Sequence, residues 1–74
     1  MNEPQTFVLR GDHITLDALL KATGLAASGG AAKVLIAQGG VHVNGSLETR
    51  RGRKLRVGDK VAVGPLRVQI IACG

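Results

Sequence analysis

The chain has almost no aromatic residues. Phe7 is the only one among 74 residues, and there is no Trp or Tyr. Proteins that bind single-stranded nucleic acid stack successive bases on several aromatic side chains. With one ring, a stacking platform of that kind is excluded.

Cysteine is equally scarce. Cys73 is the single cysteine, so the chain has no internal disulfide and its fold depends on packing alone. The absence of a disulfide framework is typical of proteins that work in a reducing compartment. We expect a cytoplasmic protein.

Long apolar runs and targeting signals are also missing. No apolar stretch approaches the ~20 residues that span a bilayer. The segment from Met1 to Gln5 lacks the positive start and apolar run of a signal peptide. We expect one domain over residues 1–74, monomeric and without a membrane partner.

Groups for catalysis or metal binding are sparse. The five acids appear scattered over caps and turns, and Ser28 has no nearby His to activate it. Two His and one Cys, spread along the chain, do not make a metal-ligand set. The sequence predicts no catalytic residue, no metal site and no cofactor, hence a protein that is not an enzyme.

What the chain does have is positive charge, +5 in total, and half of its Lys and Arg fall in residues 50–56. The cations of this segment are Arg50, Arg51, Arg53, Lys54 and Arg56. Such a block repels itself unless solvent, acids or a ligand compensates. Guanidinium groups bind phosphate oxygens in a bidentate way, so the segment predicts a phosphate site. Neutralising about five phosphates would give a slope of log affinity against log salt near −4. The alternative is a solvated loop that only aids solubility.

The hydrophobic pattern changes period midway along the chain. Leu16, Leu19 and Leu20 recur at helical spacing, with Thr15 as a plausible cap and Gly24 as a stop. A second helix is predicted over residues 31–38. Strands are predicted over residues 6–10, 41–43, 46–48, 60–63 and 66–72, with a tight hairpin at Asn44-Gly45. This order favours an α+β fold with a small antiparallel sheet.

The start of the second helix is another candidate site. Ser28 is a natural cap, Gly29 and Gly30 leave the backbone open, and Lys33 adds a charge within the first turn. Free N–H groups at a helix start bind anions. The alternative is a capped helix whose glycines allow tight packing.

An ordered set of residues resembles the RNA-binding domain family named after small-subunit ribosomal protein S4. The set comprises Leu16, Asp17, Leu20, Gly24, Ser28, Ala32, Leu35, Ile36, Gly39, Val41, Val43, Asn44, Gly45, Gly58 and Asp59. The resemblance covers about residues 14–63. It implies a two-helix corner packed on a small, mostly antiparallel twisted sheet, the αL motif, with a positive face that binds structured RNA. This chain has Thr15 and Gly29 where many members carry Arg, which shifts the expected phosphate contacts to residues 50–56.

The resulting hypothesis is a non-catalytic protein that docks on structured RNA, with ribosomal RNA as one candidate. Two rivals stay open. One is a protein-interaction adaptor that uses its basic face in ribosome assembly, and the other is a nonspecific binder of DNA or anionic surfaces.

Overall fold

The computed structural model describes residues 5–73. Most of the amino-terminal segment considered above, Met1 to Pro4, lies outside the described residues. The elements are β1 (Gln5–Leu9), β2 (Ile14–Thr15), α1 (Leu16–Ala22), α2 (Gly29–Ala37), β3 (Val41–Val43), β4 (Ser46–Leu47), β5 (Lys54–Leu55), β6 (Lys60–Val63) and β7 (Leu66–Ala72). Neither α1 nor α2 is long and apolar enough to cross a membrane.

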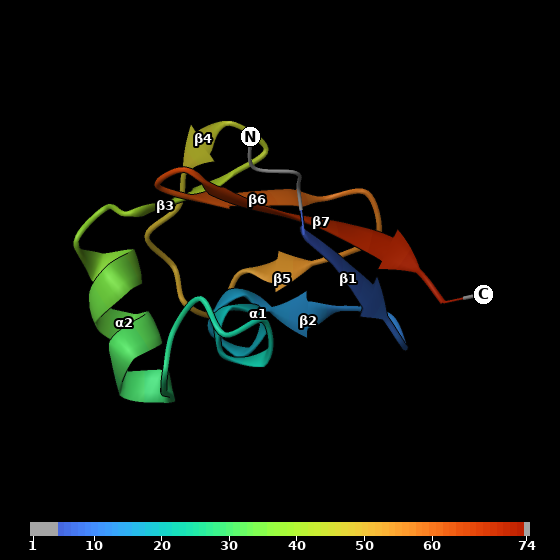
Figure 1. Cartoon of the computed structure of the whole chain (residues 1–74), viewed down its shortest axis with the longest axis horizontal. Helices are drawn as coiled ribbons and strands as arrows, with labels where there is room; N and C mark the ends of the chain where they lie inside the picture. The colour runs from blue at the N-terminus through green and yellow to red at the C-terminus, as the bar shows by residue number, and fades with distance from the viewer. Residues whose placement is uncertain (1–4, 74) are drawn as a thin grey trace.

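Two sheets carry the fold. The larger has the strand order β1-β7-β6-β3-β4, and β2 pairs with β5 in a separate two-stranded sheet. All pairs are antiparallel except β1 with β7, which run parallel. The predicted α+β class with a two-helix corner on a mostly antiparallel sheet is confirmed (Figure 1).

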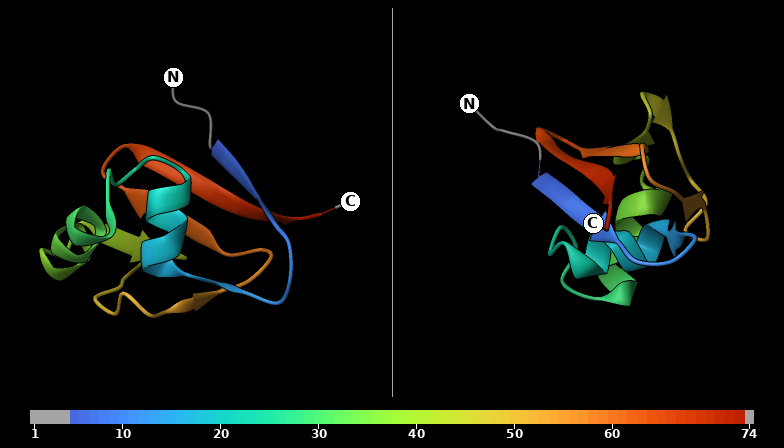
Figure 2. Two further views of the ribbon diagram at one scale, coloured as in Figure 1. Left: turned by 90° about the horizontal axis from the view of Figure 1, so that it is seen from below. Right: turned by 90° about the vertical axis from the view of Figure 1, so that its right-hand side faces the viewer.

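The core is aliphatic and lies between the helix pair and one face of the large sheet. Leu16, Leu19 and Leu20 of α1 are fully buried, as their helical spacing predicted. In β3, Val41 and Val43 are buried while His42 between them is exposed, because successive side chains of a strand point to opposite faces. Figure 2 shows both helices on the same side of the large sheet, whose opposite face is covered by no described element.

Several boundaries differ from the sequence prediction. The first strand spans Gln5–Leu9 rather than residues 6–10, and β4 ends at Leu47 rather than at residue 48. The second helix begins at Gly29, two residues before the predicted start. Glycine has a poor helix propensity, but a capped first turn tolerates it. The short β2–β5 pair was not predicted, because two-residue strands carry no alternation to detect.

Candidate nucleic-acid interface

The basic segment, residues 50–56 (hereafter the basic loop), is anchored to the start of α1. The backbone N–H of Leu16 donates to the carbonyl oxygen of Arg53 at 2.9 Å, and that of Asp17 donates to the carbonyl of Arg51 at 3.1 Å. The pairing of β2 with β5 continues this contact. The loop carbonyls thus satisfy N–H groups that a helix start leaves without partners.

The predicted role of Thr15 as a side-chain cap is wrong. Thr15 occupies the N-cap position of α1, but its side chain makes no capping hydrogen bond. The basic loop supplies the acceptors instead. These hydrogen bonds therefore fix the backbone of the basic loop relative to the start of α1.

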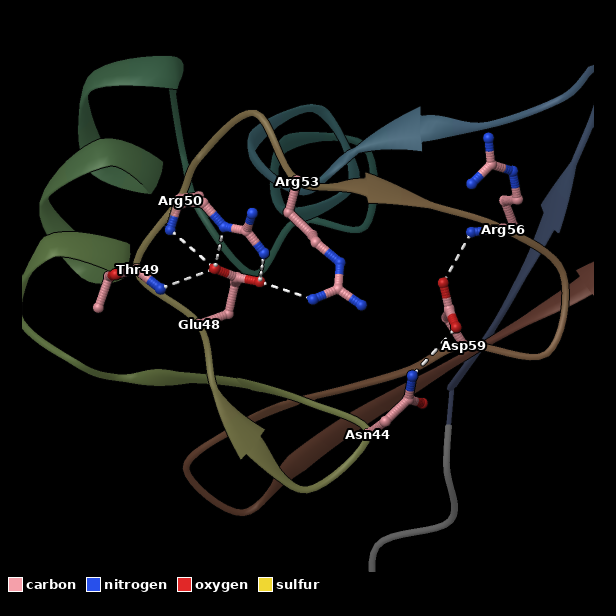
Figure 3. Close-up of polar contacts among 7 residues, drawn as sticks. All are labelled: Asn44, Glu48, Thr49, Arg50, Arg53, Arg56 and Asp59. Carbon is pink, nitrogen blue, oxygen red and sulfur yellow. Dashed lines mark hydrogen bonds and ion pairs between the residues drawn. The ribbon is translucent and has the colours of Figure 1, made fainter.

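Glu48, just before the basic loop, organises it from below (Figure 3). Its side chain is 7% exposed. Oε2 accepts the N–H groups of Thr49 and Arg50 and the Nε–H of Arg50, each at 3.1 Å. Oε1 accepts from Nη2 of Arg50 at 3.2 Å and from Nη1 of Arg53 at 2.8 Å.

These contacts keep Glu48 ionised. The hydrogen bond from the Arg50 side chain, aided by the Arg50 backbone N–H and by Arg53, lowers the pKa of Glu48 from 4.5 to about 2 despite its burial. The view of the acids as scattered over caps and turns is therefore wrong for Glu48. It compensates part of the charge of the basic loop.

The cations of the basic loop fall into three groups. Arg50 and Arg53 bond Glu48, although their side chains stay 72% and 34% exposed. Arg56 lies 3.6 Å from Asp12 in a pair that is exposed on both sides, which binds weakly in water. Arg51 and Lys54 are exposed and have no ion-pair partner among residues 5–73. They are the cations most available to a ligand.

A shallow surface depression lies at the same place. It is lined by Arg50, Gly52, Arg53 and Lys54. The three charged residues that line it are all positive, so it suits an anionic group.

A second cluster fastens the far end of the basic loop to the β3–β4 hairpin (Figure 3). Asp59 accepts the backbone N–H of Arg56 at 2.8 Å and the side-chain amide of Asn44 at 3.0 Å. The amide oxygen of Asn44 in turn accepts the N–H of Lys60 at 2.9 Å. Burial alone would raise the pKa of Asp59, but the hydrogen bonds from Arg56 and Asn44 outweigh it and lower that pKa.

Asn44 was predicted only as a turn residue. It does have a positive φ of 52°, followed by Gly45 at 85°, so the predicted hairpin is confirmed. Its bonds to Asp59 and Lys60 were missed, because they join residues 15 and 16 positions apart.

The start of α2 is the other candidate site. The Ser28 hydroxyl accepts the N–H of Ala31 at 3.1 Å, so the predicted cap is confirmed. A Cβ added at Gly29 would meet nothing within 4 Å, and one at Gly30 only the Ser28 hydroxyl at 3.8 Å. The alternative that these glycines allow tight packing is therefore wrong. Their backbone is exposed, and so is Lys33. The prediction that Lys33 lies within the first turn is wrong, because the helix begins at Gly29 and Lys33 is its fifth residue.

The two candidate sites are separate. Among the described residues, no hydrogen bond or ion pair joins residues 28–33 to the basic loop. Both belong to the helix side of the molecule in Figure 1, where the basic loop leads from β4 to β5.

The Ser28 cap gives a direct test of local stability. We expect Ser28→Ala to destabilise the fold by about 1 kcal/mol, because the N–H of Ala31 loses its acceptor. The measurement is urea unfolding followed by circular dichroism. Ser46→Ala, at an exposed position of β4, is the control and should change the free energy of unfolding by less than about 0.5 kcal/mol. Equal effects of the two substitutions would contradict the capping role.

Comparison with known proteins agrees with the fold and the motif. Residues 7–71 match the S4 domain family, so the chain belongs to that family. The chain is 42% identical over 60 residues to "Putative RNA-binding protein YbcJ" of Escherichia coli (strain K12), covering 81% of this chain and 86% of that one. It is 46% identical over 52 residues to "Probable ribosome maturation protein RlbA" of Bacillus subtilis (strain 168), covering 70% and 73%.

A solved structure is similar over nearly the whole chain. The solution structure of YbcJ from E. coli, described as having an αL motif involved in RNA binding, superposes with a TM-score of 0.74 at 40% identity. The match covers 97% of this chain and 92% of that one. The resemblance inferred from the sequence is confirmed.

Proposed function

We propose that this protein is a non-catalytic RNA-binding protein that docks on structured RNA through the basic loop and the start of α2. The observation that carries the proposal is the construction of the basic loop. Its backbone is held by α1 and by Glu48, while Arg51 and Lys54 are exposed and form no ion pair with any residue from 5 to 73. A cation held in place loses less conformational entropy when it binds a phosphate than one on a loose chain.

The members of the interface have different roles in this proposal. Arg51, Lys54 and Arg56 bind phosphates with their charge. Arg50 and Arg53 each keep N–H groups beyond those given to Glu48, and a guanidinium has five in total. Ser28, Gly29, Gly30 and Lys33 supply a helix-start phosphate site.

Folded RNA is a better ligand for such a surface than single strands. Double-stranded RNA is recognised by its shape and by contacts to phosphates and 2′-hydroxyls, whereas single strands are bound by stacking on aromatic rings. Phe7, the only aromatic residue, is half-buried against the core. The names of the two relatives support RNA as the ligand, and that of RlbA supports ribosomal RNA and a cytoplasmic location.

The proposal is tested by measuring affinity for three ligands at one salt concentration. A folded RNA hairpin should bind best, and a single-stranded RNA of equal length should bind worse than the hairpin. Duplex DNA bound as tightly as the hairpin would indicate a nonspecific polyanion binder. Weak binding to all three ligands would support an adaptor instead, provided that a pull-down with this protein recovers a partner protein that nuclease treatment does not release.

The salt dependence of RNA binding measures how many positive charges of the protein contact phosphates. Because the single negative charge of Glu48 offsets one positive charge of Arg50 and Arg53, a net four of the five positive charges of the basic loop remain to displace counterions. We therefore expect the basic loop alone to contribute about −3 to the slope of log affinity against log salt, rather than the −4 suggested by the sequence, and any further phosphate contact to make the slope steeper. Fluorescence anisotropy between about 50 and 200 mM salt measures it. A slope near zero would contradict phosphate binding.

A further inference from the structure

The face of the large sheet turned away from the helices has its own pattern of side chains. Cross-strand partners share a face of a sheet. Lys60 pairs with Gln69, Ala62 with Arg67, and His42 with Ala62, so all five lie on this outer sheet face. Their sequence neighbours Val43, Val61 and Val68 are buried on the helix side.

A groove of about 410 Å³ crosses the outer sheet face. The residues that line it are Asn44, Gly45, Lys60, Val61, Ala62, Arg67, Val68 and Gln69. The lining holds two cations and two amides and no carboxylate. The nearest acid in sequence, Asp59, has its oxygens bonded to Asn44 and to the Arg56 backbone. The groove is therefore complementary to an anion.

The two cations are close together. Arg67 lies two residues from Gln69, the partner of Lys60, which makes Lys60 and Arg67 diagonal neighbours on adjacent strands. Such neighbours are about 7–8 Å apart, so their long side chains can reach one phosphate or two successive ones. Ala62, the partner of Arg67, and Gly45, at the hairpin turn, are also part of the lining and are small, which leaves room for a sugar-phosphate backbone.

Hydrogen bonds link the lining of the groove to the end of the basic loop. Asn44 lines the groove and donates to Asp59, which accepts the N–H of Arg56 at the end of the basic loop. Figure 3 shows Arg56, Asp59 and Asn44 in a row between the loop and the hairpin. The amide oxygen of Asn44 also accepts the N–H of Lys60, so the same relay reaches one of the two cations of the groove.

We propose that the outer sheet face is a second contact surface for the same RNA, in which Lys60 and Arg67 bind phosphates of a segment that extends beyond the basic loop. This inference rests on the proposed function. Exposed aromatic rings are absent from the outer sheet face, since Phe7 is half-buried against the core. The contact is therefore with the backbone and not with stacked bases.

The test compares two arginines of equal charge. Arg67→Gln removes a cation from the groove, and Arg10→Gln removes an exposed cation just after β1. With a folded RNA hairpin, we expect Arg67→Gln to weaken binding at least about threefold and to reduce the salt slope by about 1. Lys60→Gln should behave alike, whereas Arg10→Gln should stay within about twofold of the original protein.

The outcomes separate this inference from the proposed function. Suppose that the unsubstituted protein binds the hairpin, but Arg67→Gln and Lys60→Gln match Arg10→Gln in both affinity and salt slope. The outer sheet face is then rejected as a contact surface, while the proposed role of the basic loop still stands. If the unsubstituted protein binds no folded RNA, the proposed function fails and the second surface with it. Circular dichroism of each variant checks that a loss of binding is not a loss of fold.

Discussion

Replacing Arg51 and Lys54 together by Ala is expected to weaken binding of a folded RNA hairpin at least about tenfold. These two cations project from the basic loop without an ion-pair partner among the described residues, so their whole charge is available to phosphates. In the part of the chain that the structure describes, neither side chain makes a hydrogen bond or an ion pair that would stabilise the fold. The midpoint of thermal unfolding should therefore change by less than about 2 °C. Fluorescence anisotropy measures the binding and differential scanning calorimetry the midpoint.

The control must remove the same charge elsewhere. Arg10→Ala combined with Lys21→Ala deletes two exposed cations outside the proposed contacts. We expect this variant to lose less than about threefold in affinity. If both double variants lost the same affinity, total charge rather than the basic loop would govern binding. Arg50 and Arg53 do not suit this test, because their removal would leave Glu48 without its guanidinium partners.

Glu48→Gln is expected to produce the largest loss of stability. The substitution leaves two guanidinium groups without their counter-charge and weakens the bonds to the N–H groups of Thr49 and Arg50. Both arginines can turn to water, so we expect a loss of about 1–3 kcal/mol rather than the cost of a fully buried charge. For a domain of this size, that lowers the unfolding midpoint by roughly 4–24 °C.

The same residue predicts a pH dependence. The pKa of Glu48 is lowered by folding, from 4.5 to about 2. The unfolded state therefore binds the proton more readily, and the stabilisation is fully present above pH 4.5 and disappears as the pH falls to about 2. Urea unfolding at a series of pH values should show this loss in the original protein and a smaller one in Glu48→Gln.

Asp12→Asn serves as the matched control for Glu48→Gln. Asp12 also lies near an arginine, but both partners are exposed, so its removal should cost less than about 0.5 kcal/mol. If Glu48→Gln were as stable as the original protein and followed the same pH profile, Glu48 would not organise the basic loop.

Local signals in the sequence predicted much of the fold. The leucine spacing of α1, the Ser28 cap and the Asn44-Gly45 hairpin each depend on neighbouring residues only, and the structure confirms them. The parallel pairing of β1 with β7 was not predicted, because it joins the two ends of the described chain. Nothing in either strand alone specifies that partner.

The sequence predicted which cations form the candidate site, but not the hydrogen bonds that hold them in place. The block of cations at residues 50–56 is evident from the sequence, whereas Glu48 stands outside the block and looks like an isolated acid. Its role depends on the loop turning back so that Arg50 and Arg53 meet one carboxylate. The spacing of Glu48 and Arg50, two residues apart, was the only signal that could have suggested a pair.

The central claim is that the basic loop and the start of α2 contact folded RNA. Its most direct test is a titration of the ¹⁵N-labelled protein with an RNA hairpin, followed by the amide chemical shifts of each residue. The account predicts the largest changes at residues 50–56, with a second set at residues 28–33. Changes confined to other parts of the chain, with both of these segments unmoved, would contradict it.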